Sequence, residues 1–237
     1  MILNKPYVIA SIKKTTRDVT TFTFKSQDGT KIDFSPGMFA MLTYKDPATG
    51  EKTARAFSIA NTPPSDTLDF FISMIHGKLT SKLESAKVGD VYYMSAPYGQ
   101  FKYEQKHGEK LLFLAGGTGL APFFSMLEYI IGRNEKPDIV LIYSVKYPYD
   151  IIEKEKLSEM ISLLGGKLAV TVTRHTPDDG WNGDSGHVDA KMILKYAPDA
   201  KERTSYICGP PAFVKALKDA LVSLGINDRE IKAEMWG

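Results

Sequence analysis

The stretch LLFLAGGTGLAPFFSML, residues 111–127, decides how the second half of the chain folds. Its first five residues are all apolar, which is typical of a strand buried on both faces of a parallel sheet. GGTG then turns the chain, and Pro122 suits the first turn of a helix. These glycines and the proline interrupt the longest uncharged run at its centre, which argues against a membrane-spanning helix. We therefore expect a buried strand, a turn and a helix.

Three further pairs of a compact apolar segment and a helical segment follow this one. Strand then helix, repeated four times, predicts parallel strands with helices on both faces, a doubly wound α/β domain. We expect the strands at 111–117, 138–145, 168–174 and 205–211, and the helices at 121–133, 151–164, 189–196 and 212–224.

The first hundred residues instead contain short segments rich in β-branched and aromatic residues. Turn signals such as Asp28-Gly29 and Pro36-Gly37 separate these segments, which favours a sandwich or a small barrel. A short helix is expected to start near Thr80, whose hydroxyl suits a helix cap. The polar stretch 106–109 marks the boundary between domains at 1–106 and 107–237. We expect the strands of the first domain at 8–12, 20–26, 32–44 and 68–75.

The composition is that of an ordinary globular protein of 237 residues, with a net charge of +2, 24% charged and 43% hydrophobic residues. It excludes a disordered tail, a coiled coil and a strongly basic nucleic-acid-binding protein. The single cysteine, Cys208, excludes a disulfide framework and any cysteine-ligated zinc or iron–sulfur site held by this chain. No metal site is expected. Because the first residues lack the apolar core of a signal peptide, we expect a reducing cytoplasm and no membrane.

Two short motifs in the first half combine groups that suit a flat, charged ligand. In RAFS, residues 55–58, Arg55 and Phe57 share one face of a strand and Ser58 lies on the other. A ligand at the strand end therefore meets a cation, a ring and a hydroxyl. In GKLTSKL, residues 77–83, a glycine and two hydroxyl residues at a helix start suit a phosphate. Each motif is also explained without a ligand, as a strand with an exposed arginine and as a capped helix.

Two glycine turns in the second half occupy strand ends, where ligands of open α/β sheets bind. Gly116, Gly117 and Gly119 leave room for a pyrophosphate, which the following helix N-terminus attracts. Their pattern is GGxG and lacks the acidic residue of the GxGxxG fingerprint, so a plain connection remains an equal alternative. CGPP, residues 208–211, ends the last predicted strand, where the cysteine is either buried and structural or functional.

Six motifs follow one another in a set order: RAFS, GxxT with Leu83, PYGQF, GGTGLAP, CGPP and a C-terminal Glu-x-aromatic. In this order they resemble the ferredoxin–NADP reductase family of flavoproteins over essentially the whole chain. The resemblance implies an α+β two-domain protein. Its N-terminal domain would be an antiparallel Greek-key β-barrel that binds FAD, and its C-terminal domain a doubly wound parallel α/β sheet that binds NADP or NAD.

On the FAD side, the resemblance implies that Arg55 pairs with the pyrophosphate. It also implies that Phe57 packs against the isoalloxazine ring and that the Ser58 hydroxyl faces flavin N5. It further implies backbone contacts from the strand that ends near Met74 and a phosphate-binding turn at Gly77. The implied FAD-binding residues are Arg55, Ala56, Phe57, Ser58, Ile72, Met74, Gly77, Leu79, Thr80 and Ser81.

On the dinucleotide side, Thr173-Arg174 stands where NADP-preferring members place a Ser-Arg pair for the 2′-phosphate, and Lys146 adds charge. Trp236 stands where the family's terminal aromatic ring covers the flavin. The implied dinucleotide-side residues are Gly117, Thr118, Gly119, Pro122, Thr173, Arg174, Cys208, Gly209, Pro210 and Trp236. The implied catalytic residues are Ser58, Cys208, Glu234 and Trp236.

The activity implied is that of an FAD-dependent NAD(P)H oxidoreductase. Hydride would pass between NADPH and flavin, and single electrons to or from a small acidic carrier such as ferredoxin or flavodoxin. The alternatives are an oxygenase-reductase component, a flavin or quinone reductase, and an electron-transfer subunit of a larger complex. The absence of a fused iron–sulfur domain favours a stand-alone reductase. We expect a monomer or weak dimer.

The first half of the chain is the more basic one. Residues 1–107 carry 14 basic and 10 acidic side chains, whereas residues 108–237 carry 16 and 18. Chance explains this difference as well as a docking role does. If the charge is functional, the docking residues expected near the flavin edge are Lys13, Lys14, Lys78 and Lys82.

Overall fold

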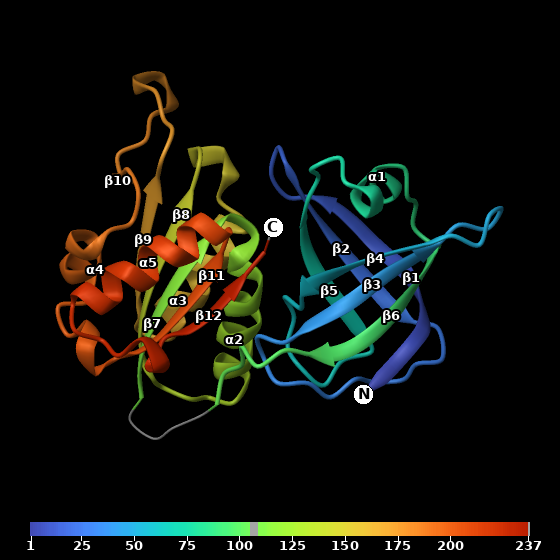
Figure 1. The fold of residues 1–237 in the computed structure, drawn as a ribbon, viewed down its shortest axis with the longest axis horizontal. Helices are drawn as coiled ribbons and strands as arrows, with labels where there is room; N and C mark the ends of the chain where they lie inside the picture. The colour runs from blue at the N-terminus through green and yellow to red at the C-terminus, as the bar shows by residue number, and fades with distance from the viewer. Residues whose placement is uncertain (105–108, 237) are drawn as a thin grey trace.

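The computed structural model describes residues 1–104 and 109–236, which form two domains side by side (Figure 1). The predicted boundary between residues 106 and 107 lies outside the described residues. The first domain is a curled, six-stranded antiparallel sheet and the second a parallel sheet covered by helices. Both halves of the predicted fold class are therefore confirmed. No helix in the described part of the chain is both long and apolar enough to cross a bilayer.

The N-terminal sheet has the strand order β4-β3-β6-β1-β2-β5, in which β6 returns to pair with β1 as in a Greek key. Its core is aromatic, with Phe24 packed edge-on against Phe70 and Tyr92. The segment after β4 bonds to β5, since the Ala60 amide donates to the Asp69 carbonyl at 2.8 Å. The elements are β1 Ile2–Lys14, β2 Val19–Ser26, β3 Phe39–Lys45, β4 Lys52–Ser58, β5 Thr67–Ser73, α1 Lys78–Glu84 and β6 Val91–Tyr98.

Three sequence expectations in this domain differ from the structure. The expected strand 32–44 is continuous only over β3, because Gly37 turns the chain with φ +100 just before it. Strand β6 was not anticipated. Helix α1 begins at Lys78, and Thr80 lies in its first turn with Oγ1 accepting from the Gly77 amide at 2.8 Å. The helix is thus found near Thr80 as expected, but its N-cap is Gly77 and not Thr80.

The C-terminal sheet is entirely parallel, with the order β10-β9-β8-β7-β11-β12. Alternate residues of β7 enter two cores: Phe113 packs with α2 and α3, whereas Leu112 packs with α4 and α5. This confirms the doubly wound arrangement. The elements are β7 Lys110–Gly116, α2 Ala121–Gly132, β8 Asp138–Val145, α3 Lys154–Leu163, β9 Lys167–Val172, β10 Asp184–Ser185, α4 Ala190–Tyr196, β11 Thr204–Gly209, α5 Pro211–Ser223 and β12 Lys232–Met235.

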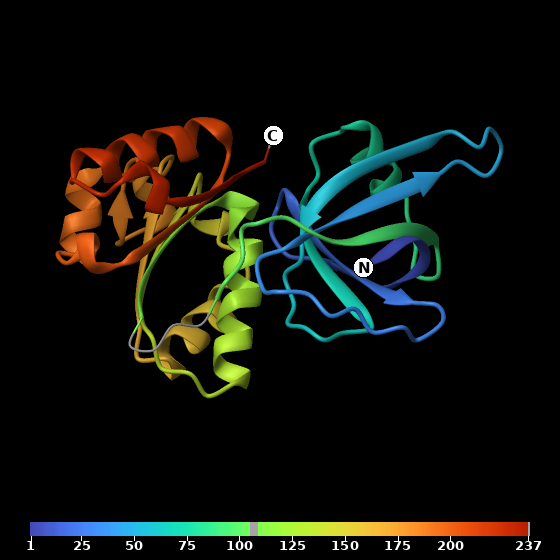
Figure 2. The ribbon, with the colours of Figure 1, turned by 60° about the horizontal axis from the view of Figure 1, so that its bottom comes forward.

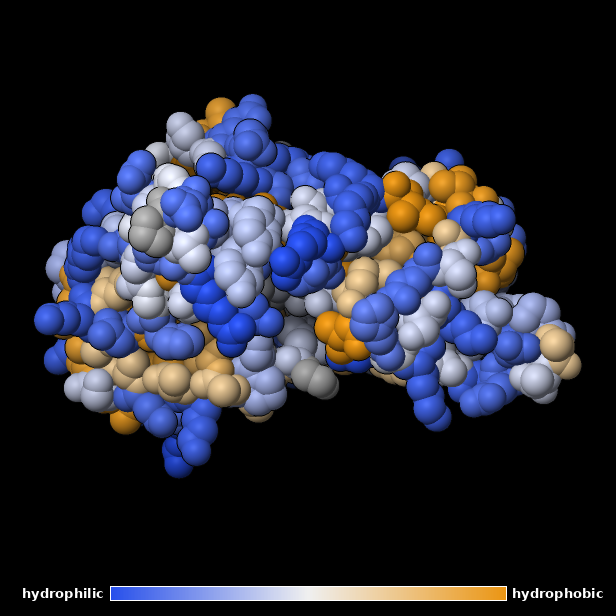
Figure 3. Space-filling model, turned by 90° about the horizontal axis from the view of Figure 1, so that it is seen from above, coloured by the Kyte–Doolittle hydropathy of each residue, from blue (hydrophilic) through white to orange (hydrophobic). Residues whose placement is uncertain are grey.

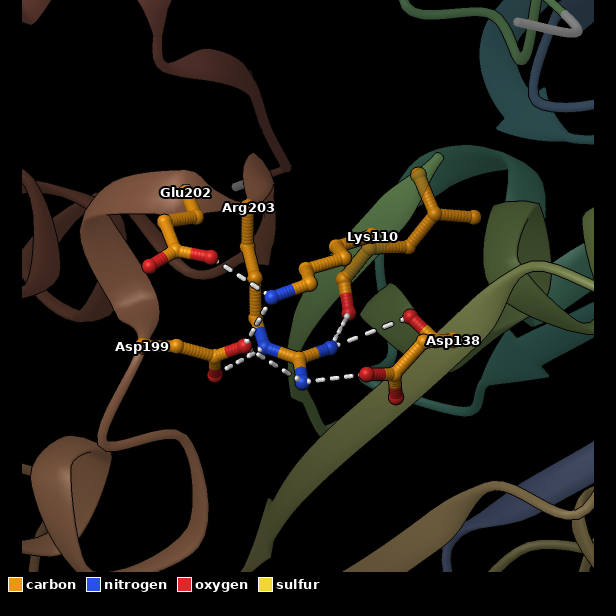
Figure 4. A network of polar contacts seen from close by, with 6 residues as sticks. Lys110, Asp138, Asp199, Glu202 and Arg203 are labelled. Carbon is orange, nitrogen blue, oxygen red and sulfur yellow. Dashed lines mark hydrogen bonds and ion pairs between the residues drawn. The ribbon is translucent and has the colours of Figure 1, made fainter. Parts of the chain in front are cut away.

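A buried arginine joins the starts of three neighbouring strands at the amino edge of this sheet (Figure 4). The Arg203 guanidinium, 4% exposed, bonds to Asp199 at 2.7 Å and to Asp138 at 2.8 Å. Lys110 joins Asp199 at 2.9 Å. The hydrogen bond from Arg203 lowers the pKa of Asp199 to about 2. This cluster lies at the amino edge of the sheet, whereas the glycine turns lie at the carboxyl edge.

Helix α2 lies between the parallel sheet and the barrel (Figure 2). Phe124 of α2 packs edge-on against Phe71 of β5, with ring centroids 5.3 Å apart. Next to it, the Ser125 hydroxyl donates to the Asn61 carbonyl at 2.7 Å. These contacts bring the barrel strands β4 and β5 close to the carboxyl ends of β7 and β11.

Candidate active site

The RAFS motif forms one wall of a narrow cavity, the barrel-side cavity, where the two domains meet. Strand β4 pairs with β3 in regular antiparallel register, which fixes Arg55 and Phe57 on one face. Ser58, 7% exposed, ends the strand and lines the same cavity. The lining residues are Arg55, Ala56, Phe57, Ser58, Phe71, Ser73, Ile75, Thr80, Thr118, Ala121 and Trp236.

The turn before α1 lies directly beside the arginine of RAFS. A Cβ built on Gly77 would be 3.7 Å from Arg55 Nη1 and 3.4 Å from Thr80 Oγ1. Any side chain there would thus occupy the space between the guanidinium and the turn. The Thr80 hydroxyl already bonds to both backbone groups of Gly77, as donor at 3.2 Å and acceptor at 2.8 Å. Two motifs separated in sequence therefore form one cationic corner.

The two glycine turns of the C-terminal domain are also in contact. A Cβ on Gly119 would lie 2.2 Å from the Cys208 carbonyl oxygen, so only glycine fits at this position. Gly117 has φ +55, which glycine adopts readily. Both turns line the central cavity of about 200 Å³. Its lining residues are Thr16, Asp18, Val19, Ser73, Gly116, Gly117, Thr118, Gly119, Val145, Lys146, Asp150, Ile152, Gly209, Pro210 and Trp236.

A third cavity, the outer cavity of about 520 Å³, continues from the glycine turns past the ends of β8 and β9. Its basic side chains are Lys146, Arg174 and His187, and no acidic side chain is among the described residues that line it. Thr173 lies here with Oγ1 donating to the Val145 carbonyl at 3.3 Å. Apolar groups, including Phe213, form the remaining wall. The cavity is therefore suited to an anion attached to a flat apolar group.

The C-terminal segment places Trp236 between the barrel-side and central cavities, both of which it lines. Its amide donates to the Gly209 carbonyl at 3.1 Å, and its ring packs edge-on against Phe39 at 5.6 Å. Glu234 is close to the barrel, since a Cβ on Gly99 would be 3.6 Å from Glu234 Oε1. Burial raises the pKa of Glu234 to about 7. Within residues 1–104 and 109–236, Glu234 Oε2 and Trp236 Nε1 are buried without a hydrogen-bond partner.

Several predicted site residues do not present their side chains to these cavities. Ile72 and Leu79 belong to the barrel core, so only their backbone is available to a ligand. Cys208 is fully buried in the core of the C-terminal domain. Burial and the nearby Glu234 raise the pKa of its thiol far above the usual range, which leaves it protonated. A chemical role for the Cys208 sulfur thus receives no support from its position.

The remaining predicted residues lie around the cavities with less direct roles. Met74 is partly buried against the barrel core, Ser81 is exposed on α1, and Pro122 is buried in the first turn of α2. Sequence reasoning missed cavity-lining residues from loops, namely Thr16, Asp18, Asp150 and His187. None of them belongs to a motif or a periodic pattern, so the sequence carried no signal for them.

Two family models together match most of the chain. One describes an oxidoreductase FAD-binding domain and matches residues 6–103, and the other describes an oxidoreductase NAD-binding domain and matches residues 113–219. The chain belongs to the ferredoxin–NADP reductase family. Its two cofactors are therefore FAD and a nicotinamide dinucleotide.

Two relatives of the chain carry names that point to different electron acceptors. The chain is 33% identical over 210 residues to the 2-halobenzoate 1,2-dioxygenase electron transfer component of Burkholderia cepacia, covering 87% of this chain and 60% of that protein. It is 30% identical over 181 residues to NADH-cytochrome b5 reductase 1 of Debaryomyces hansenii, covering 74% and 63%. The chain thus spans about three fifths of the length of these relatives.

Solved structures confirm the fold over the whole chain. A ferredoxin NADP+ reductase from Neisseria gonorrhoeae with bound FAD and NADP has a TM-score of 0.81 at 24% identity, covering 99% of both chains. The flavohem-like FAD/NAD binding domain of nitric oxide dioxygenase from Vibrio cholerae reaches 0.88 at 20% identity, also covering 99% of both.

The residues present fit both cofactors of the family. The corner formed by Arg55 and Gly77 suits the pyrophosphate of FAD, because a guanidinium and a close backbone approach both favour that anion. The ring of Phe57 and the hydroxyl of Ser58 lie along the same cavity. On the other side, the space that Gly119 leaves open and the basic outer cavity suit a dinucleotide.

The raised pKa of Glu234 predicts a pH-dependent stability. A buried carboxyl that stays protonated up to about pH 7 stabilises the folded protein at low pH, and this contribution is lost as pH rises through 7. From pH 5 to 8, wild type should therefore lose about 2–4 °C of melting temperature relative to Glu234→Gln. Thermal melts of both proteins across this range measure the effect. Glu230→Gln, an exposed nearby control, should follow wild type, and parallel curves for all three proteins would contradict the assignment.

Proposed function

We propose that this protein is an FAD-dependent NAD(P)H oxidoreductase, with residues 1–106 as its FAD domain and 107–237 as its dinucleotide domain. One observation carries the proposal: the barrel-side and central cavities share Ser73, Thr118 and Trp236. A flavin ring held in the first cavity and a nicotinamide held in the second would meet at these residues. That arrangement is what direct hydride transfer between two cofactors requires.

Bound FAD supplies the redox chemistry, since it takes up two electrons as hydride and gives them up singly. The protein's own groups bind and orient the two cofactors. Arg55 and the Gly77 turn would hold the pyrophosphate, and the Ser58 hydroxyl would face the reacting edge of the flavin ring. Gly119 would let the dinucleotide approach the backbone. The indole of Trp236 lines both cavities, so it would have to move aside for a nicotinamide to stack there. Glu234 holds a proton next to this position.

The direct test is an anaerobic titration of the purified protein with NADH and NADPH in parallel. A yellow protein with a flavin spectrum that bleaches on addition of either nucleotide is expected. A colourless protein that takes up no added FAD would contradict the FAD site. A protein that binds FAD but is not reduced would instead favour a subunit that is redox-active only within a larger assembly.

A second candidate function is that of an oxygenase-reductase component. It is favoured by relatives named as the electron transfer component of 2-halobenzoate 1,2-dioxygenase and the glycine betaine monooxygenase reductase subunit of Pseudomonas aeruginosa. Turnover with an iron–sulfur oxygenase component, compared with ferredoxin, flavodoxin, free flavin and quinones, distinguishes the acceptors. A monomer or weak dimer in the cytoplasm is consistent with either function.

The outer cavity predicts a preference for NADPH over NADH. The 2′-phosphate distinguishes these nucleotides, and Arg174 lies in a cavity lined by no described acidic residue. Arg174→Ala should raise the Michaelis constant for NADPH about five- to tenfold while leaving that for NADH nearly unchanged. Steady-state kinetics with both nucleotides measure the effect. Equal changes for both would place Arg174 away from the 2′-phosphate.

Free lysines near the cavities predict a salt-sensitive reaction with an acidic electron carrier. Lys13 and Lys82 are bonded to Glu153 and Asp46, whereas Lys14 and Lys78 have no ion pair within residues 1–104 and 109–236. With ferredoxin or flavodoxin, the association rate should fall about tenfold or more between low and physiological salt, because screening removes electrostatic steering. Stopped-flow measurements of the wild-type protein across this range of salt concentration test the prediction. A flat salt profile would reject the docking model.

A further inference from the structure

The turn between β1 and β2 reaches out of the barrel to the loop that follows β8 in the other domain (Figure 1). We propose that Arg17, at the tip of this turn, is a positioning residue. Its guanidinium packs on the rings of Tyr147 and Tyr149 and thereby sets the width of the central cavity for the dinucleotide. This inference rests on the proposed function. The group formed by Arg17, Tyr147 and Tyr149 is called the clasp below.

The contacts within the clasp cross the domain boundary. The Tyr147 and Tyr149 rings are stacked with their centroids 5.1 Å apart and their planes 8° from parallel. The Arg17 guanidinium carbon lies 5.8 Å from the first ring centroid and 5.4 Å from the second. Arg17 Nη1 also donates to the Tyr149 hydroxyl at 3.5 Å. Seen from above, hydrophilic residues gather where the two domains meet (Figure 3).

Both sides of the clasp continue into the wall of the central cavity. On the barrel side, Asp18 follows Arg17 and lines the cavity, while its carbonyl accepts from the Met74 amide at 2.9 Å. On the opposite side, the Tyr147 amide donates to Asp150 at 3.2 Å, and Asp150 lines the same cavity. A change in the contacts within the clasp must therefore move both walls of the central cavity.

The turn that carries Arg17 is itself firmly held. The amides of Thr15 and Thr16 both donate to the Val19 carbonyl at 3.0 Å, and the Val19 amide donates to the Thr16 hydroxyl at 3.1 Å. A rigid turn transmits the position of Arg17 to the cavity wall. The nearby pair of Lys13 and Glu153, 2.5 Å apart, is a second tie between the domains. That exposed ion pair is screened by salt, whereas a guanidinium over aromatic rings is less affected.

The test compares Arg17→Ala with Arg229→Ala, an exposed arginine in the other domain, in the FAD-loaded protein. Arg17→Ala should weaken dinucleotide binding about two- to fivefold by isothermal calorimetry. The flavin content and the maximal rate should change much less, so that the effect appears in KM. Arg229→Ala should match wild type. Loss of flavin together with dinucleotide affinity would mean a merely structural role and would overturn the proposal.

Variants of the aromatic partner distinguish the ring from its hydroxyl. Tyr149→Leu should reproduce Arg17→Ala, and the double variant should be no weaker than either single one. Tyr149→Phe keeps the ring and should bind the dinucleotide like wild type. Additive losses in the double variant would overturn the clasp, since they would mean that the two side chains act independently.

A second readout needs no nucleotide and separates the clasp from the proposed function. In wild type, the Met74 amide is bonded to Asp18 and should exchange its hydrogen slowly. Arg17→Ala should speed this exchange about two- to fivefold, whereas Arg229→Ala should not. If wild type fails to react with NADH and NADPH, the proposed function fails while this result still tests the clasp. Unchanged exchange in Arg17→Ala would overturn the clasp alone.

Discussion

Gly119→Ala is expected to weaken dinucleotide binding severely and to lower the stability of the protein by about 3 kcal/mol. The new Cβ would be 2.2 Å from the Cys208 carbonyl oxygen and 2.8 Å from the Gly209 nitrogen. Both are backbone atoms, which cannot rotate away as a side chain does. The two turns would have to separate, and the cavity wall that they form together would be lost.

The measurement combines chemical denaturation with dinucleotide titration of the FAD-loaded variant. Affinity should fall by about 100-fold or more, while FAD remains bound in the other domain. Gly132→Ala is the matched control, because its Cβ would meet nothing within 4 Å. Alanine in place of that helical glycine should leave binding intact and slightly raise stability. Normal dinucleotide affinity in Gly119→Ala would refute the assignment of this turn.

Arg55→Ala is expected to weaken FAD binding by about 1.5–3 kcal/mol, or about 10- to 100-fold. The physical reason is the loss of a charge-assisted pair with the pyrophosphate in the corner between Arg55 and Gly77. Arg55→Lys keeps the charge but not the planar fork, and should lose less. The flavin remaining after dialysis, measured from the visible spectrum, ranks the variants.

Lys52→Ala provides the control for Arg55→Ala, since Lys52 is an exposed cation at the start of the same strand. It should retain FAD as wild type does. If Arg55→Ala kept stoichiometric flavin through dialysis, the arginine would not be a pyrophosphate ligand. The barrel-side cavity would then need another cation to hold FAD.

The C-terminal domain was predictable because its central strands β7, β8 and β11 are buried on both faces and alternate with helices. β8 was expected at 138–145 and is found there, and α2 and α5 begin within one residue of their expected starts. The barrel was harder to predict. Gly77 precedes α1 and has no side chain that could mark a helix cap. The cap was therefore predicted at Thr80 instead. Composition alone likewise predicted one strand over residues 32–44, whereas the turn at Gly37 divides this segment.

The site was predictable only where its residues form compact motifs. RAFS, the Gly77 turn, the GGTG turn and the C-terminal Trp236 were all found from the sequence, and the structure brings them together. His187 follows a strand of two residues, and Asp18 belongs to an ordinary turn. Their importance depends on how distant segments meet. The motif also suggested Cys208, but its sulfur lies in the core of the C-terminal domain, which the sequence did not reveal.

The cluster around Arg203 has a practical consequence for redesign. It fastens three strands at the end of the sheet that faces away from the glycine turns. If the proposed function holds, stability and nucleotide choice depend on opposite ends of the same strands. On the proposed function, exchange of the loop that follows β9 and carries Arg174 should change nucleotide preference without disturbing this anchor. Substitutions among the charged groups of the anchor, by contrast, should affect expression and shelf life while leaving the choice of nucleotide unaltered.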